Sequence, residues 1–147
     1  ESEKYLDYMF YQRRKVSAEN LRNISNTVCY SSVATASDLE APVIVAPSVS
    51  GFTTRMLSKW RPKALIAGLS PSMTAVRQMQ LYWGVKPFHA KRAESTDALL
   101  FASVELLKEK GIVKEGEIVV ATAGVVTRAN RHEPVADTNI MRVMVVE

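Results

Sequence analysis

Hydroxyl side chains gather around a glycine immediately after the apolar segment PVIVAP. Ser48, Ser50 and Thr53 supply hydroxyl donors, and Gly51 allows a ligand to approach the backbone closely. If a helix begins at this point, its first backbone N–H groups, around Phe52, lack acceptors within the helix. Hydroxyls and unpaired amides at the start of a helix are typical of a phosphate-binding loop. These five residues are therefore the candidate phosphate-binding residues.

The same residues also fit an ordinary helix cap, because Ser and Thr are preferred just before a helix. Their spacing alone leaves both interpretations open. The stretch is not a Walker loop, since no Lys-Ser or Lys-Thr pair follows the glycine. Nucleotide hydrolysis at this loop is therefore not supported.

A second candidate is the irregular stretch from Gly124 to Asn139. It is too long for a default connection, and long loops in compact domains are often functional. Gly124, Arg128, Arg131 and His132 are the residues that could reach an anionic ligand from this loop. Exposed arginines in a loop are also commonly just solvated, and this alternative stays open.

Composition predicts one globular domain with a proper core, since the chain has 147 residues, 47% hydrophobic and 23% charged. A single cysteine excludes an intrachain disulfide. No apolar run approaches the roughly 20 residues of a membrane span, and the first residues lack a signal-peptide pattern. We therefore expect a cytoplasmic protein with no membrane contact.

The net charge of +4 suits a small anionic ligand. Most of the basic residues alternate with acidic ones, as in LLKEKGIVKEGE, and no basic stripe is interleaved with aromatic residues. The charge pattern therefore argues against nucleic-acid binding.

Apolar segments alternate with helical patterns along the chain. We expect helices over 4–14, 18–39, 53–60, 72–82 and 96–110, and strands over 42–47, 64–70, 84–88, 117–124 and 140–147. Ser70, followed by Pro71, is expected to cap the helix over 72–82. This order predicts a layered α/β domain with a mainly parallel sheet. Ligands in such sheets bind beyond the carboxyl ends of the strands, which is where Ser48 lies.

Three stretches of the sequence resemble the C-terminal domain of pyruvate kinases. They are APVIVAPSVSGFTTRMLSKWRPKALIAGLSPSMTAVRQMQLYWGVKPF, KGIVKEGEIVVATAG and TNIMRVMVV. The resemblance covers residues 17–147, and residues 1–16 are similar to the helical segment that joins this domain to the catalytic barrel. It implies a three-layer α/β/α sandwich with strand order 3-2-1-4-5 and an antiparallel last strand. That order would bring the two candidate loops together, where a phosphorylated effector binds in allosteric members of the family.

The effector loop departs from the family pattern at several positions. Ser48, Ser50, Gly51 and Thr53 match the phosphate loop, but Val49 and Phe52 stand where animal and yeast enzymes tend to have Lys and Arg. Leu99 occupies a position where members that respond to fructose 1,6-bisphosphate carry an Arg for the second phosphate. The resemblance therefore implies a sugar monophosphate or AMP rather than fructose 1,6-bisphosphate.

Catalysis by the family belongs to the barrel, with Mg²⁺ and K⁺ as its cofactors. The resemblance therefore implies that this chain, taken alone, binds no cofactor and does not transfer the phosphoryl group of phosphoenolpyruvate to ADP. It also implies a homo-oligomer, dimer or tetramer, in which a neighbouring subunit covers the last strand, which is apolar on both faces. Cover by a helix of the same chain is the alternative.

Two other classes of function stay open beside a regulatory domain. The chain could be a purely structural domain that only builds an oligomer. It could also be a small enzyme acting on a phosphorylated substrate, for which His132 and Glu133 are the only acid–base pair near the loops.

Overall fold

The computed structural model describes residues 23–124 and 138–147, and the fold is given for these residues. The elements in chain order are α2 (Ile24–Asp38), β1 (Val43–Pro47), α3 (Phe52–Ser58), β2 (Leu65–Ser70), α4 (Met73–Met79), β3 (Val85–His89), α5 (Thr96–Glu109), β4 (Ile118–Ala123) and β5 (Ile140–Val145). The predicted helix over 4–14 and the leading segment 1–16 lie outside the described residues.

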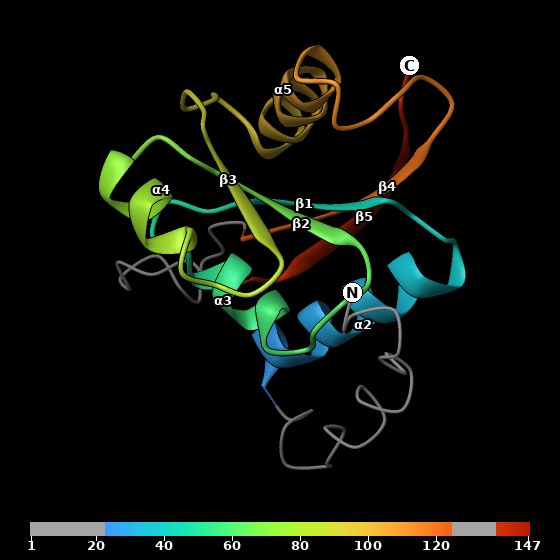
Figure 1. The fold of residues 1–147 in the computed structure, drawn as a ribbon, viewed down its shortest axis with the longest axis horizontal. Coiled ribbons are helices and arrows are strands. Elements are labelled where there is room, and N and C mark those ends of the chain that lie inside the picture. Colours follow the sequence, from blue (N-terminus) through green and yellow to red (C-terminus); the bar gives the residue numbers. More distant parts are fainter. Residues whose placement is uncertain (1–22, 125–137) are drawn as a thin grey trace, which may run out of the picture.

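Five strands form one sheet in the order β3-β2-β1-β4-β5. The pairs β1–β2, β2–β3 and β1–β4 are parallel, and β5 runs antiparallel to β4. The predicted α/β class and strand order are thus confirmed. Because β1 and β4 are neighbours although they are far apart in the sequence, the direction of strand addition reverses between them (Figure 1).

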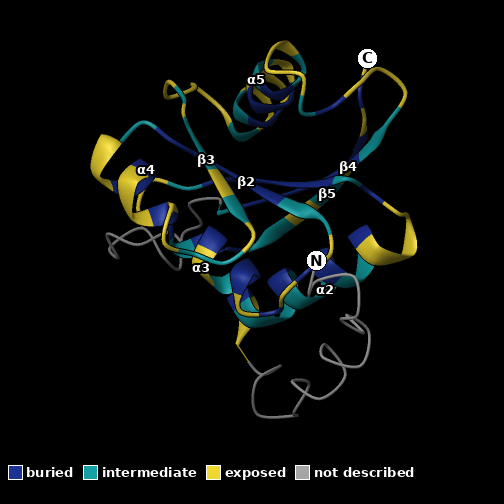
Figure 2. Cartoon of the chain, viewed as in Figure 1, coloured by how far each residue is buried: buried dark blue, intermediate teal, exposed yellow. Residues whose placement is uncertain are grey.

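The sheet is the middle of three layers. Helix α5 covers one face, and α2 and α3 cover the other (Figure 1). Along β1, Val43 and Val45 pack toward α5, whereas Ile44 and Ala46 pack toward α2 and α3. All four are at most 2% exposed, and the strands at the centre are dark blue in Figure 2. Burial on both faces explains why this strand is a continuous apolar run.

The edge strand β5 has one covered and one open face. Met144 and Val146 join the core cluster under α5, so a helix of the same chain covers that face. Met141, Val143 and Val145 point the other way and are 40%, 44% and 59% exposed. The sequence left open whether a neighbouring subunit or a helix of the same chain covers the last strand. For the Met144 face of β5, a helix of the same chain is confirmed.

The cap of α4 differs from the prediction. Ser72 is the capping residue, and its hydroxyl accepts a hydrogen bond from the Ala75 amide at 3.3 Å. Ser70 is the last residue of β2 and lies two residues before this cap. Its hydroxyl accepts a hydrogen bond from the Ser72 amide at 3.1 Å and donates to the Val49 carbonyl at 3.0 Å. Ser70 thus ties the end of β2 to the hydroxyl-rich loop.

Helix α2 ends in a conformation that favours glycine, although the residue there is Glu40, with φ 52°. The Ala41 amide donates to the Ala36 carbonyl at 2.9 Å, which closes the helix end around this residue. We expect Glu40→Gly to raise the free energy of unfolding by about 0.5–1 kcal/mol, because relief of left-handed strain exceeds the entropy that glycine adds to the unfolded chain. Urea denaturation measures this.

The matched control at this position is Glu40→Ala, which removes the carboxylate but keeps the Cβ atom. It should give no comparable gain. Equal stabilisation by both variants would show that the charge of Glu40, rather than its backbone, is unfavourable.

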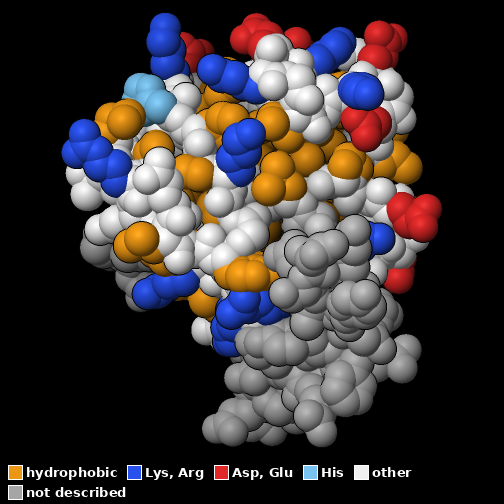
Figure 3. Space-filling view, in the orientation of Figure 1, with side chains coloured by type: hydrophobic (Ala, Val, Ile, Leu, Met, Phe, Trp, Pro, Cys, Tyr) orange, Lys and Arg blue, Asp and Glu red, His pale blue; other side chains and the backbone are white. Residues whose placement is uncertain are grey.

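Within residues 23–124 and 138–147, no helix combines the length and apolarity needed to cross a membrane. On the face shown in Figure 3, Lys and Arg side chains are spread among neutral and apolar ones rather than gathered into a stripe.

Candidate functional site

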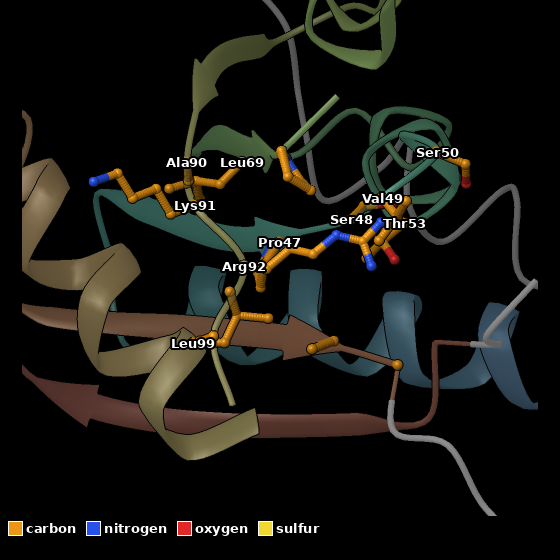
Figure 4. Close-up of a pocket in the computed structure, with 14 residues that line it drawn as sticks. Pro47, Ser48, Val49, Ser50, Thr53, Leu69, Ala90, Lys91, Arg92 and Leu99 are labelled. Carbon is orange, nitrogen blue, oxygen red and sulfur yellow. The ribbon is translucent and has the colours of Figure 1, made fainter. Parts of the chain in front are cut away.

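A pocket of about 480 Å³ lies beyond the carboxyl ends of the central strands. Pro47 ends β1, Ala123 ends β4, and Leu69 is near the end of β2, and all three line it (Figure 4). The pocket is therefore at the point where the strand order reverses, as expected for a ligand site in an open α/β sheet.

The hydroxyl-rich loop forms one wall of this pocket. Ser48, Ser50 and Thr53 are lining residues, as the sequence predicts for a binding loop. Figure 4 shows the Ser50 hydroxyl turned away from the centre of the pocket. This hydroxyl is also a weak acceptor for the Phe52 amide, at 3.4 Å. Ser48 and Thr53 are thus the better placed of the three hydroxyl side chains.

Gly51 and Phe52 are not among the residues given above as lining the pocket, and their part in phosphate binding stays a prediction. Gly51 precedes α3 with φ 79°, and an added Cβ would lie 3.0 Å from Met79 Cγ. The Thr54 hydroxyl donates to the Gly51 carbonyl at 2.7 Å, which fixes this turn. Glycine is therefore required here for the backbone conformation and for close packing.

The second predicted loop meets the first one at the pocket. Gly124, the residue after β4, is a lining residue together with Ser48 and Thr53. The two stretches identified from the sequence are therefore brought together. The predicted contributions of Arg128, Arg131 and His132 lie outside the described residues and stay predictions.

Two basic residues of the pocket were missed by sequence reasoning. Lys91 and Arg92 follow β3 and line the cavity. Figure 4 shows Arg92 extending across the pocket toward Ser48 and Thr53, whereas Lys91 points away. The sequence did offer a signal for them, because both residues come just after the carboxyl end of a strand. Ser48 was identified from the same kind of position.

Among the described residues that line the pocket, none is Asp or Glu, so the charged side chains that they contribute are positive. Apart from the three hydroxyl and two basic residues, the lining consists of Pro47, Val49, Leu69, Pro71, Ala90, Ala93, Leu99, Ala123 and Gly124. Leu99 lies near the start of α5 and makes this part of the pocket wall apolar. A second anionic group placed here would therefore meet no positively charged side chain from α5. The arrangement suits a ligand with one anionic group and a larger neutral part.

A buried hydrogen bond connects the pocket to the start of β5. The Thr53 and Thr138 hydroxyl oxygens are 2.8 Å apart, and both residues are buried. Thr138 lies two residues before β5 begins. This hydrogen bond therefore links a wall of the pocket to the segment that leads into the edge strand β5. Among the described residues, no group of three or more His, Cys, Asp and Glu is placed to hold a metal ion.

Cys29, on α2, is a buried thiol close to this hydrogen bond. Burial raises its pKa from 9.0 to about 12, although a hydrogen bond with Thr138 and the charge of Lys59 lower it. The unfolded chain therefore loses this proton above pH 9, while the folded protein keeps it until about pH 12. Because the raised pKa favours folding only while the thiol is protonated, stability should fall as pH rises through this window.

We expect the titration of Cys29 to lower the free energy of unfolding by about 1 kcal/mol when the pH is raised from 8 to 10. Denaturation of the wild type and Cys29→Ala at both pH values isolates the effect, because the variant lacks this thiol and loses its part of the pH dependence. Identical pH profiles for the two proteins would show that Cys29 does not titrate differently in the folded state.

Comparison with known proteins identifies the family. The sequence model described as "Pyruvate kinase, alpha/beta domain" matches residues 26–144. A pyruvate kinase of Clostridium acetobutylicum is 35% identical over 148 residues, which cover all of this chain and 30% of the relative. A pyruvate kinase of Geobacillus stearothermophilus is 36% identical over 131 residues, which cover 87% of this chain and 21% of the relative. The chain thus spans less than a third of these relatives.

Solved structures show the same fold. A crystal structure of a pyruvate kinase from Cryptosporidium parvum superposes with a TM-score of 0.79 at 20% identity, covering 99% of this chain and 28% of that one. The Cryptosporidium parvum enzyme in complex with ADP gives a TM-score of 0.77 at 21% identity, covering 97% and 28%. By sequence and by fold, the chain belongs to the pyruvate kinase family and is its C-terminal α/β domain.

Proposed function

We propose that this chain is the regulatory and assembly domain of an enzyme that transfers the phosphoryl group of phosphoenolpyruvate to ADP, and that it binds a phosphorylated effector in the pocket beyond β1 and β4. The observation that carries this proposal is the convergence of Arg92 with Ser48 and Thr53 in a cavity whose described lining contains no acidic residue. An arginine fork and nearby hydroxyls are the donors that a phosphate monoester requires.

The magnitudes support binding at metabolite concentrations. Each hydrogen bond to a charged group contributes about 1.5–3 kcal/mol, and the entropic cost of association offsets part of the sum. A cavity of about 480 Å³ suits a small metabolite. Because Leu99 is apolar and offers no charge to a second phosphate, a ligand with one phosphate group is favoured over a ligand with two. The proposed effector is a sugar monophosphate or AMP rather than fructose 1,6-bisphosphate.

Calorimetric titration of the intact protein with glucose 6-phosphate, ribose 5-phosphate, AMP and fructose 1,6-bisphosphate tests this function. At least one monophosphate should bind, while glucose, ribose and adenosine should not. Ser48→Ala should weaken binding more than Ser50→Ala, because the Ser50 hydroxyl points away from the centre of the pocket. Failure of all four phosphorylated compounds to bind would refute the effector role.

A separate observation favours a role in assembly, namely the open face and free edge of β5. Val143 and Val145 are 44% and 59% exposed on a strand whose only partner within residues 23–124 and 138–147 is β4. Apolar edge strands invite pairing with another chain, so we propose that a second copy covers β5. Val143→Lys should lower the mass measured by light scattering, and Lys114→Ala, on the surface, should not. An unchanged mass for Val143→Lys would contradict assembly through this strand.

A further inference from the structure

Thr53 and Thr138 form a short buried hydrogen bond that joins two parts of the site. Their hydroxyl oxygens are 2.8 Å apart, and the two residues are 4% and 0% exposed. Thr53 lines the pocket from the first turn of α3, and Thr138 precedes β5. The bond therefore connects the proposed ligand wall to the strand at the free edge of the sheet.

The direction of this hydrogen bond decides what Thr53 presents to the pocket. A hydroxyl has one proton and two lone pairs. If Thr53 donates to Thr138, it turns only lone pairs toward the cavity, and these repel an anion. If Thr138 donates to Thr53, the Thr53 proton is free to point into the cavity. A phosphate group therefore selects the second direction.

We propose that Thr138 is a positioning residue of the pocket: its hydroxyl donates to Thr53, so that Thr53 in turn donates to a bound phosphate group. This inference rests on the proposed function, because it assumes that the ligand is an anion. It deepens that function, because a ligand in the pocket then sets the hydrogen-bond direction of Thr138, which lies two residues before β5.

The test uses the intact protein, with inorganic phosphate and glucose 6-phosphate as separate probes in calorimetric titrations. Thr138→Val keeps the side-chain shape but removes the hydroxyl, and it should raise the Kd for each probe about three- to tenfold. Thr138→Ser restores the hydroxyl and should remain within about twofold of the wild type.

Thr122→Val is the matched control. Thr122 is equally buried, and its hydroxyl donates to the Ile140 carbonyl at 2.9 Å, but it does not line the pocket. This variant should lose stability without losing affinity for phosphate. A purely structural role of Thr138 would make the two valine variants alike.

A double variant gives a further readout. In a Thr53→Val background, Thr138→Val should cause no additional loss of affinity, because its effect passes through Thr53.

The outcomes separate the two claims. If inorganic phosphate and all four phosphorylated compounds named above fail to bind the wild-type protein, the proposed function fails and this inference fails with it. If both probes bind and Thr138→Val binds them as tightly as the wild type, only this inference is overturned. Additive losses in the double variant would overturn it as well.

Discussion

Replacing Arg92 with glutamine is expected to weaken binding of a phosphate monoester about ten- to hundredfold, the factor that corresponds to one hydrogen-bonded charge pair. Arg92 extends across the pocket toward Ser48 and Thr53, and none of the described lining residues is an acid that would compete with the proposed phosphate for its charge. Glutamine keeps much of the length but supplies neither the charge nor the fork of donors. Calorimetric titration of the intact protein measures the ratio of Kd values.

Lys91→Gln is the control for net charge. Lys91 is adjacent in sequence and lines the same cavity, but its ammonium points away from the hydroxyl wall. Removing this charge should change the Kd by no more than about threefold, a screened long-range effect. Equal losses for the two variants would mean that the pocket attracts anions only through its overall potential and that Arg92 makes no direct contact.

Trp60→Ala is expected to lower the free energy of unfolding by about 3–5 kcal/mol, the usual cost of truncating a buried aromatic residue. Trp60 is fully buried in the core cluster between α2, α3 and the sheet, and its ring centroid lies 5.2 Å from that of Tyr30. Such a loss is a large fraction of the about 5–15 kcal/mol that stabilises a typical domain. Urea denaturation followed by circular dichroism measures it.

Trp60→Phe separates packing from hydrogen bonding. Within the described parts of the chain, the Trp60 Nε1 atom is buried and has no hydrogen-bond partner, so phenylalanine removes area but no bond. It should therefore cost well under half as much as Trp60→Ala. A loss as large as that of the alanine variant would show that the indole N–H has a partner that matters. A loss below about 1 kcal/mol for Trp60→Ala would contradict its place in the core.

The strands were predictable because buried strands carry a local signature, whereas their order in the sheet came from the family resemblance. PVIVAP and ALIAGLS are apolar runs too short for core helices, and the first is bounded by prolines. The ends of helices were less predictable. Helix α3 ends at Ser58 rather than Trp60, because the chain turns into a positive φ of 50° at Arg61. Pro62 predicts that the helix ends before Arg61, because the residue before a proline avoids the helical conformation, but it does not set the last helical residue.

The candidate site was predictable only in part. The position of Ser48, Thr53 and Gly124 follows from strand order, because loops after neighbouring parallel strands share one edge of the sheet. The direction of a side chain within an irregular loop does not follow from strand order, and the sequence therefore did not distinguish Arg92 from a solvated arginine. Ser70 was misassigned for a similar reason, because a serine before a proline fits a helix cap as well as a strand end.

A crystal structure of the intact protein with the monophosphate that binds most tightly in the titrations is the most direct test of the effector pocket. The account predicts a phosphate group within hydrogen-bonding distance of both the Ser48 hydroxyl and the Arg92 guanidinium, with the rest of the ligand lying along the wall that contains Leu99. A phosphate bound away from β1 and β4, or one held in the pocket with Arg92 turned to solvent, would contradict it.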